Sequence, residues 1–138
     1  MIQSSKKQAL SRYRQQARAV QAERQVLESA LMGTEALVEG CLVVVRTVCG
    51  KAGCRCRTSR RRRHGPYLHL SLLRNGKTRM IHLPRQWEEA AREGVEAARR
   101  FRRAHQQWRA LNRRMENLWR QVERNRRYLP YEPKKKSR

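Results

Sequence analysis

Four side chains that can bind a metal ion lie close together in the sequence: Cys49, Cys54, Cys56 and His64. Structural zinc sites take four ligands in a tetrahedron, usually all cysteine or cysteine with histidine. The four residues between Cys49 and Cys54 are within the range of a zinc knuckle, and the tighter Cys54-x-Cys56 spacing can still chelate. The pattern therefore predicts a Cys₃His zinc site. The alternative is a set of ordinary thiols in a reducing cell.

The remaining cysteine and two further histidines are less suited to metal binding. Cys41 begins an apolar run, and we expect it to be a small core residue rather than a ligand. His69 and His82 could face each other across a hairpin and bind a second metal, but with no third ligand nearby we expect them to face solvent. A redox role for Cys54 and Cys56 is disfavoured by their one-residue spacing and by the lack of a helix N-terminus behind them. The predicted ligand set therefore stays at four residues.

A run of basic residues occupies the same segment as the predicted ligands. Seven cations fall within thirteen residues: Lys51, Arg55, Arg57, Arg60, Arg61, Arg62 and Arg63. The arginine guanidinium matches phosphate oxygens and stacks on exposed bases, and Tyr67 could add a stacking ring. We therefore predict that these residues bind nucleic acid; the alternative is a charge run that only aids solubility. The arginine-rich back of the C-terminal helix is a second candidate surface.

The charge of the whole chain also favours a polyanionic partner. In 138 residues the chain carries a net charge of +23, with 27 arginines and no aspartate. Residues 41–83 hold eleven basic side chains and no acidic one. Because such self-repulsion destabilises an isolated protein, we expect a nucleic acid partner, either DNA or RNA.

Apolar segments are short throughout the chain. The longest uninterrupted run, residues 41–45, is far too short to span a bilayer, and residues 1–7 lack the apolar segment of a secretory signal. We therefore expect no membrane partner and a cytoplasmic location. In that reducing compartment, clustered cysteines bind metal more often than they form disulfides.

The apolar periodicity predicts an α+β fold with two helices and a small three-stranded antiparallel sheet. Apolar residues recur at three- and four-residue spacing from Leu10 to Leu31, broken only by Arg24, which indicates a helix. Strands are expected at about 41–48, 67–74 and 77–83, with Asn75-Gly76 as the hairpin turn. The predicted parts are an N-terminal helix at 1–35, a zinc loop and β-hairpin at 36–84, a coiled-coil helix at 85–129 and a disordered basic tail at 130–138.

An apolar seam runs along the long helix at unbroken three-four spacing, as in a coiled coil. Its members are Trp87, Ala90, Gly94, Ala97, Phe101, Ala104, Trp108, Leu111, Met115, Leu118 and Val122. We expect the first helix to pack along this seam as an antiparallel partner. Self-association through part of the seam, and hence a homo-oligomer, is the alternative.

The order and spacing of several short motifs over much of the chain resemble those of a small prokaryotic family of unknown function. The shared pattern is Cys49-Gly50-Lys51, Cys54-x-Cys56 and His64-Gly65-Pro66-Tyr67, then a strand, Gly76-Lys77, a second strand and a proline before a helix. The resemblance covers about residues 36–120, and such proteins are often found near mobile elements and transposases. It implies that the four predicted ligands act as a unit, in a setting of DNA or RNA mobility. The segment before His64 is more arginine-rich than the pattern requires.

Catalytic carboxylates are missing from the basic segment. Two-metal nucleases need clustered carboxylates, and a zinc hydrolase needs an open coordination position with a carboxylate nearby. We therefore predict a zinc-stabilised, non-catalytic nucleic-acid-binding accessory protein, belonging to a mobile-element or nucleoprotein complex. The alternative is a helical adaptor whose coiled-coil seam docks a partner protein.

Overall fold

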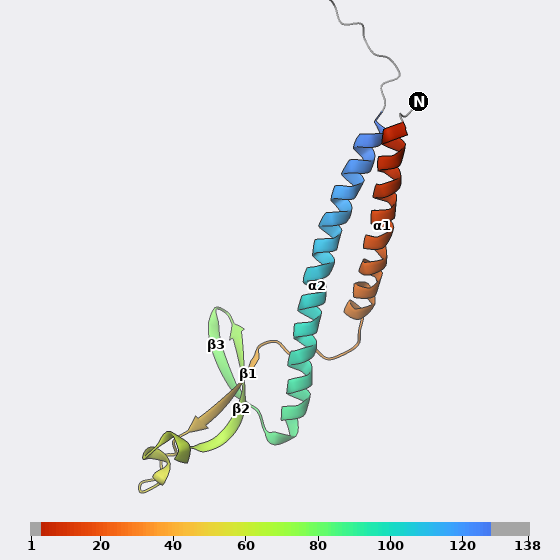
Figure 1. Ribbon diagram of the computed structural model, residues 1–138. Coiled ribbons are helices and arrows are strands. Elements are labelled where there is room, and N and C mark those ends of the chain that lie inside the picture. Colours follow the sequence, from red (N-terminus) through yellow and green to blue (C-terminus); the bar gives the residue numbers. More distant parts are fainter. Residues whose placement is uncertain (1–3, 128–138) are drawn as a thin grey trace, which may run out of the picture. The chain divides into compact units, whose positions relative to one another are not determined.

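The computed structural model describes residues 4–127 and has the predicted α+β architecture (Figure 1). Its elements are helix α1 (Ser4–Leu31), strand β1 (Cys41–Thr47), the 3₁₀ turns η1 (Arg55–Arg57) and η2 (Arg60–Arg62), strands β2 (His64–Arg74) and β3 (Lys77–His82), and helix α2 (Arg85–Arg126). The described chain forms two compact units, one with residues 4–33 and 103–127 and the other with residues 34–102. The predicted tail at 130–138 lies outside the described residues.

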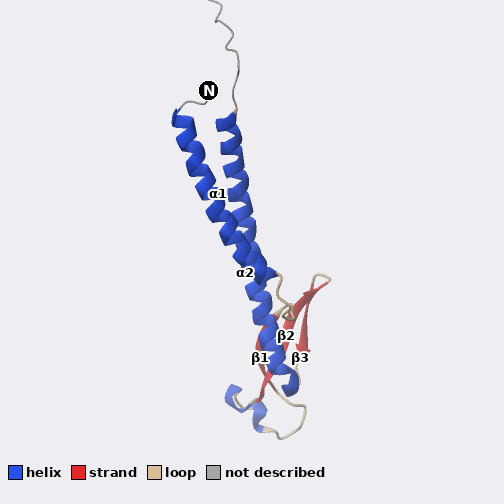
Figure 2. Ribbon diagram, turned by 90° about the vertical axis from the view of Figure 1, so that its right-hand side faces the viewer, coloured by secondary structure: helices blue, strands red, loops and turns tan. Residues whose placement is uncertain are grey.

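The first unit is a pair of antiparallel helices, formed by α1 and the C-terminal half of α2 (Figures 1 and 2). Its core contains Ala17 and Val20 of α1 packed with Met115 and Leu118 of α2. Val20 is fully buried, because the three-four spacing of both helices points one apolar stripe of each at the other. The predicted packing of the first helix on the seam is confirmed in this half of α2.

Arg24, which breaks the apolar stripe of α1, joins the two helices of this unit through polar contacts. Its guanidinium donates to Glu28 at 3.0 Å and lies 5.7 Å from the ring centre of Trp108. The indole N–H of Trp108 donates to the same Glu28 carboxylate at 2.8 Å. The pKa of Glu28 lies below its ordinary value, first because of the Trp108 hydrogen bond and then because of that from Arg24. The break in the stripe therefore contributes a specific cross-helix contact rather than a defect.

The second unit contains a three-stranded antiparallel sheet in the order β1-β2-β3. Asn75 and Gly76 both have positive φ, 51° and 72°, as a type I′ turn requires. The predicted hairpin is confirmed, and in its register Arg74 stands opposite Lys77 and His69 opposite His82. β2 begins three residues earlier than predicted, at His64, because its first residues pair with the end of β1.

The sheet buries few of its side chains, and the expectation for Cys41 is wrong. Cys41 is exposed rather than part of the core, because it is the first residue of an edge strand. The apolar face that contains Leu68 is only partly covered: Leu68 is buried, whereas Val44 is 63 % and Ile81 46 % exposed. A sheet of only three strands has two edges, and few other residues pack against its faces. Most of its apolar side chains therefore keep some contact with solvent.

In the second unit α2 buries only part of the predicted seam, together with residues beside it. Gly94 and Ala97 of the seam are buried with Ala91, Val95 and Ala98, whereas Trp87 is 58 % and Phe101 36 % exposed. Small side chains allow a close approach of neighbouring backbone that the aromatic rings would prevent. The apolar seam is therefore continuous in the sequence but not in the pattern of burial.

Gly94 is the point of closest approach on this part of α2. The backbone N–H of Val38 donates to the Gly94 carbonyl at 3.0 Å, and a Cβ on Gly94 would lie 2.5 Å from Cγ2 of Val38. An ion pair between Arg100 and Glu35, at 3.0 Å, holds the same segment to the helix. The segment before β1 thus packs on α2 at Gly94, where any larger residue would collide with Val38.

Substitution Gly94→Ala should destabilise the protein, although alanine favours helix by about 1 kcal/mol. Overpacking against the stiff Val38 side chain and loss of the hydrogen bond outweigh that gain, for a net loss of about 1–2 kcal/mol. Urea denaturation of the two proteins measures the difference. In a Val38→Ala background the same substitution should cost less, and a Gly94→Ala protein more stable than the wild type would contradict this packing.

Candidate metal centre

The loop between β1 and β2 brings the four predicted ligands together. Cys49 follows β1 by two residues, Cys54 precedes η1, Cys56 lies inside η1, and His64 is the first residue of β2. Because Thr47 pairs with His64, the strand ladder places the first and last ligands side by side before any metal binds. The 3₁₀ turn η1 then returns the chain so that the middle two cysteines face them.

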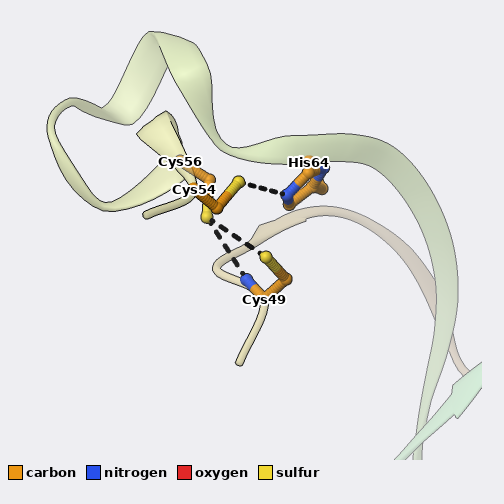
Figure 3. A group of neighbouring side chains, drawn as sticks. All are labelled: Cys49, Cys54, Cys56 and His64. Carbon is orange, nitrogen blue, oxygen red and sulfur yellow. Dashed lines mark hydrogen bonds between the residues drawn. The ribbon is translucent and has the colours of Figure 1, made fainter. Parts of the chain in front are cut away.

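Ligand atoms of the four side chains all lie within 4.8 Å of one another and point toward a common centre (Figure 3). The Sγ atoms of Cys49 and Cys56 are 3.7 Å apart, and Sγ of Cys54 is 3.4 Å from Nε2 of His64. A tetrahedral zinc ion with Zn–S bonds of ~2.3 Å places neighbouring ligand atoms about 3.5–3.8 Å apart. These two edges already have the length that a tetrahedral ion requires.

The surroundings of Cys54 and Cys56 shift the pKa values of the two thiols in opposite directions. The pKa of Cys54 lies below its ordinary value, mainly because of a hydrogen bond from the backbone N–H of Cys56. Burial raises the pKa of Cys56, which is only 2 % exposed, and this is opposed by the backbone N–H of Cys49, which donates to its Sγ at 3.4 Å. A bound cation would deprotonate a coordinating thiol outright. The site is therefore chemically suited to a metal with thiolate and imidazole ligands.

The predicted nucleic-acid-binding cations lie on the same loop as the four ligands. Exposed side chains are those of Lys51, Arg55, Arg57, Arg60, Arg61 and Arg62, while Arg63 is half-buried. η1 and η2 carry five of these arginines, and Thr58 between them donates from its hydroxyl to the Arg55 carbonyl at 2.7 Å. Tyr67 lies further along β2 and is 39 % exposed. The basic side chains are therefore mostly exposed on the loop that carries the four ligands.

His69 and His82 face each other across the hairpin as predicted, with ring centres 5.1 Å apart. Within residues 4–127, however, Cys49, Cys54, Cys56 and His64 are the only group of three or more metal-binding side chains close enough to share an ion. Arg85 and Glu88, which the sequence analysis did not select for binding, line a hollow together with Tyr67 and His82. No short motif identifies that hollow, because its walls come from β2, β3 and the start of α2.

Comparison with protein families gives one match. Residues 17–93, more than half of the chain, match the model of the domain of unknown function DUF6788. The chain belongs to this family. No curated protein and no solved structure matches it.

The DUF6788 match includes all four ligands, the basic segment and the hairpin, and ends within the first half of α2. This agrees with the resemblance to a family of unknown function, although the match begins and ends earlier than the predicted range of 36–120. The family assigns no activity, and proximity to mobile elements stays a prediction. Across residues 4–127, no helix has the length and apolar character that crossing a membrane requires.

Purified wild-type protein should contain about one equivalent of a divalent metal per chain, and Cys56→Ser should lose most of it, because one of four ligands is removed. Elemental analysis of protein prepared without chelator measures this content. Cys41→Ser is the matched control: the exposed Cys41 lies outside the cluster, so this variant should keep its metal. Wild-type protein with less than half an equivalent would overturn the assignment of the site.

Proposed function

We propose that this protein is a zinc-stabilised, non-catalytic nucleic-acid-binding protein. The observation that carries the proposal is the position of four clustered side chains that could bind a metal inside the most basic segment of the chain. Arginine side chains bind phosphate tightly when their backbone is held in place, since less conformational entropy is lost on binding. The metal would provide that fixed backbone for residues 51–63.

Zinc is the metal that best suits the ligand set. Three thiolates and one imidazole form a soft to borderline donor set, and the cluster edges of 3.4 and 3.7 Å suit a tetrahedron. Calcium and magnesium take oxygen ligands instead, at sites with six or more positions. We therefore assign the proposed ion as Zn²⁺.

A structural rather than catalytic role follows from the completeness of the ligand set. Catalytic zinc sites keep one position open for water, whereas four protein ligands close the tetrahedron. The chain has no aspartate, and no glutamate lies between Glu39 and Glu88, so a carboxylate base would have to come from outside the basic segment. The proposed ion therefore fixes the loop and activates no water.

The proposed partners are DNA or RNA, and the setting is a nucleoprotein complex such as that of a mobile element. Support comes from the charge, because eleven basic and no acidic side chains between residues 41 and 83 attract any polyphosphate strand. We place the protein in the cytoplasm, with no membrane partner, because reducing conditions keep the three ligand thiols free for metal.

A second candidate function is that of a protein adaptor, favoured by aromatic side chains on the surface of α2. Trp87 is 58 % and Trp119 56 % exposed, and large exposed aromatic side chains are enriched at protein interfaces. A docked partner protein would cover these rings. The adaptor proposal predicts binding that changes little with salt concentration, whereas phosphate binding is strongly salt-dependent.

Affinity for a nucleic acid should fall steeply with salt, with a slope of log affinity against log salt of about −5 for ~6 phosphate contacts. Replacing Arg60, Arg61, Arg62 and Arg63 by glutamine should weaken binding and flatten that slope by about three units, while the metal content stays unchanged. Fluorescence anisotropy at several salt concentrations measures both.

The control for this experiment removes the same charge elsewhere. A variant with glutamine at four exposed arginines of α2 has the same net charge: Arg102, Arg109, Arg113 and Arg114. If this variant loses as much affinity as the loop variant, binding follows total charge and not the metal-held segment. If neither variant loses affinity, or the wild-type slope is near zero, the nucleic-acid proposal is wrong.

A further inference from the structure

Three aromatic side chains meet on one face of the sheet, next to the metal-binding loop. Tyr67 and His69 are two residues apart on β2 and so share a face, and His82 of β3 stands opposite His69. The ring centres of Tyr67 and His82 are 5.8 Å apart in an edge-to-face arrangement, and those of His69 and His82 are 5.1 Å apart. This is a contiguous aromatic surface, with Tyr67 39 % exposed.

A hollow of about 540 Å³ opens beside these rings. Tyr67 and His82 line it together with Arg85 and Glu88 from the first turn of α2. The hollow thus combines aromatic rings, one permanent cation and one carboxylate within a single unit of the chain. Its volume is in the range of small-molecule sites.

The composition of the hollow suits a nucleobase better than a phosphate group. Each nucleobase has a flat π-face that stacks on tyrosine or histidine, and arginine also stacks on bases. The carboxylate of Glu88 would repel a phosphate but can accept a hydrogen bond from an exocyclic amino group of a base. Inside a duplex that π-face is covered by neighbouring bases, so only an unpaired base can enter.

The residues that line the hollow on β2 come directly after the last of the four ligands in the sequence. His64 is the first residue of β2, and Tyr67 is three residues further on, with Gly65 and Pro66 also lining the hollow. Coordination by His64 would therefore fix the start of the same strand that presents the Tyr67 ring. Phosphates bound by the arginines and a base bound by Tyr67 would contact consecutive parts of one strand.

We propose that the hollow lined by Tyr67, His82 and Arg85 binds an unpaired nucleobase, so that the preferred ligand is single-stranded nucleic acid. The inference rests on the proposed function and adds to it the class of ligand. The arginine segment supplies salt-dependent affinity for any strand, and the hollow supplies the preference for unpaired bases. Bases of both DNA and RNA have the flat π-face that would stack here, so both are tested.

Anisotropy titrations compare a short single strand, its duplex and an abasic single strand of the same length, each as DNA and as RNA. Wild-type protein should bind the single strand about 5- to 100-fold more tightly than the abasic strand, the range of one stacked base. Because this arm uses the unmodified protein, it does not depend on whether a variant folds. Equal affinity for normal and abasic strands overturns the inference.

Two substitutions at Tyr67 separate stacking from structure. Tyr67→Ala should lower single-strand affinity by the same factor, with duplex affinity, salt slope and metal content unchanged, whereas Tyr67→Phe keeps the ring and should retain the affinity. Arg85→Gln should weaken single-strand binding while preserving the salt slope of the loop arginines.

The two proposals fail in different ways. If wild-type protein binds none of the six nucleic acids, the proposed function itself is wrong. If it binds them with the expected salt slope but without preference for unpaired bases, or if Tyr67→Ala weakens duplex and single strand alike, the arginine segment binds nucleic acid and the hollow does not bind a base.

Discussion

The pairing of β1 with β2 is the constraint on which the candidate site depends. Both chain segments that enter and leave the basic loop belong to this ladder, and Thr47 stands opposite His64 at its end. The loop is therefore closed by backbone hydrogen bonds, and only Cys54 and Cys56 must be brought in by the local turn η1. Closing a loop before the metal binds reduces the entropy that binding must overcome.

Electrostatics gives the same segment its second constraint. A loop with seven cations repels itself, and three ionised thiolates around a divalent ion would carry a net charge of −1 at its centre. This charge would offset a small part of the repulsion, while the exposed arginine side chains would keep their positive charge at the surface. The helical unit has a different balance, because Glu28, Arg24 and Trp108 satisfy one another across α1 and α2.

Local signals in the sequence predict much of this structure. Asn75-Gly76 identifies the hairpin and its register because few residues adopt positive φ at both positions. The ligand set is predictable because cysteine and histidine are few and their spacing is short. What could not be predicted depends on contacts between distant segments: the close approach of Val38 to Gly94, the exposure of Cys41, and the hollow shared by β2, β3 and α2. Periodicity places residues on a face, but only the tertiary neighbours decide whether that face is covered.

The residues between the last cysteine and the histidine contribute no ligand to the cluster. Residues 57–63 connect Cys56 to His64, so their side chains would not be constrained by the geometry of a bound metal. A segment anchored at both ends but not used for coordination can change its sequence while the anchor stays intact. Substitutions on the exposed side of this short insert should therefore change the surface chemistry of the loop with little effect on the stability of the protein that carries it.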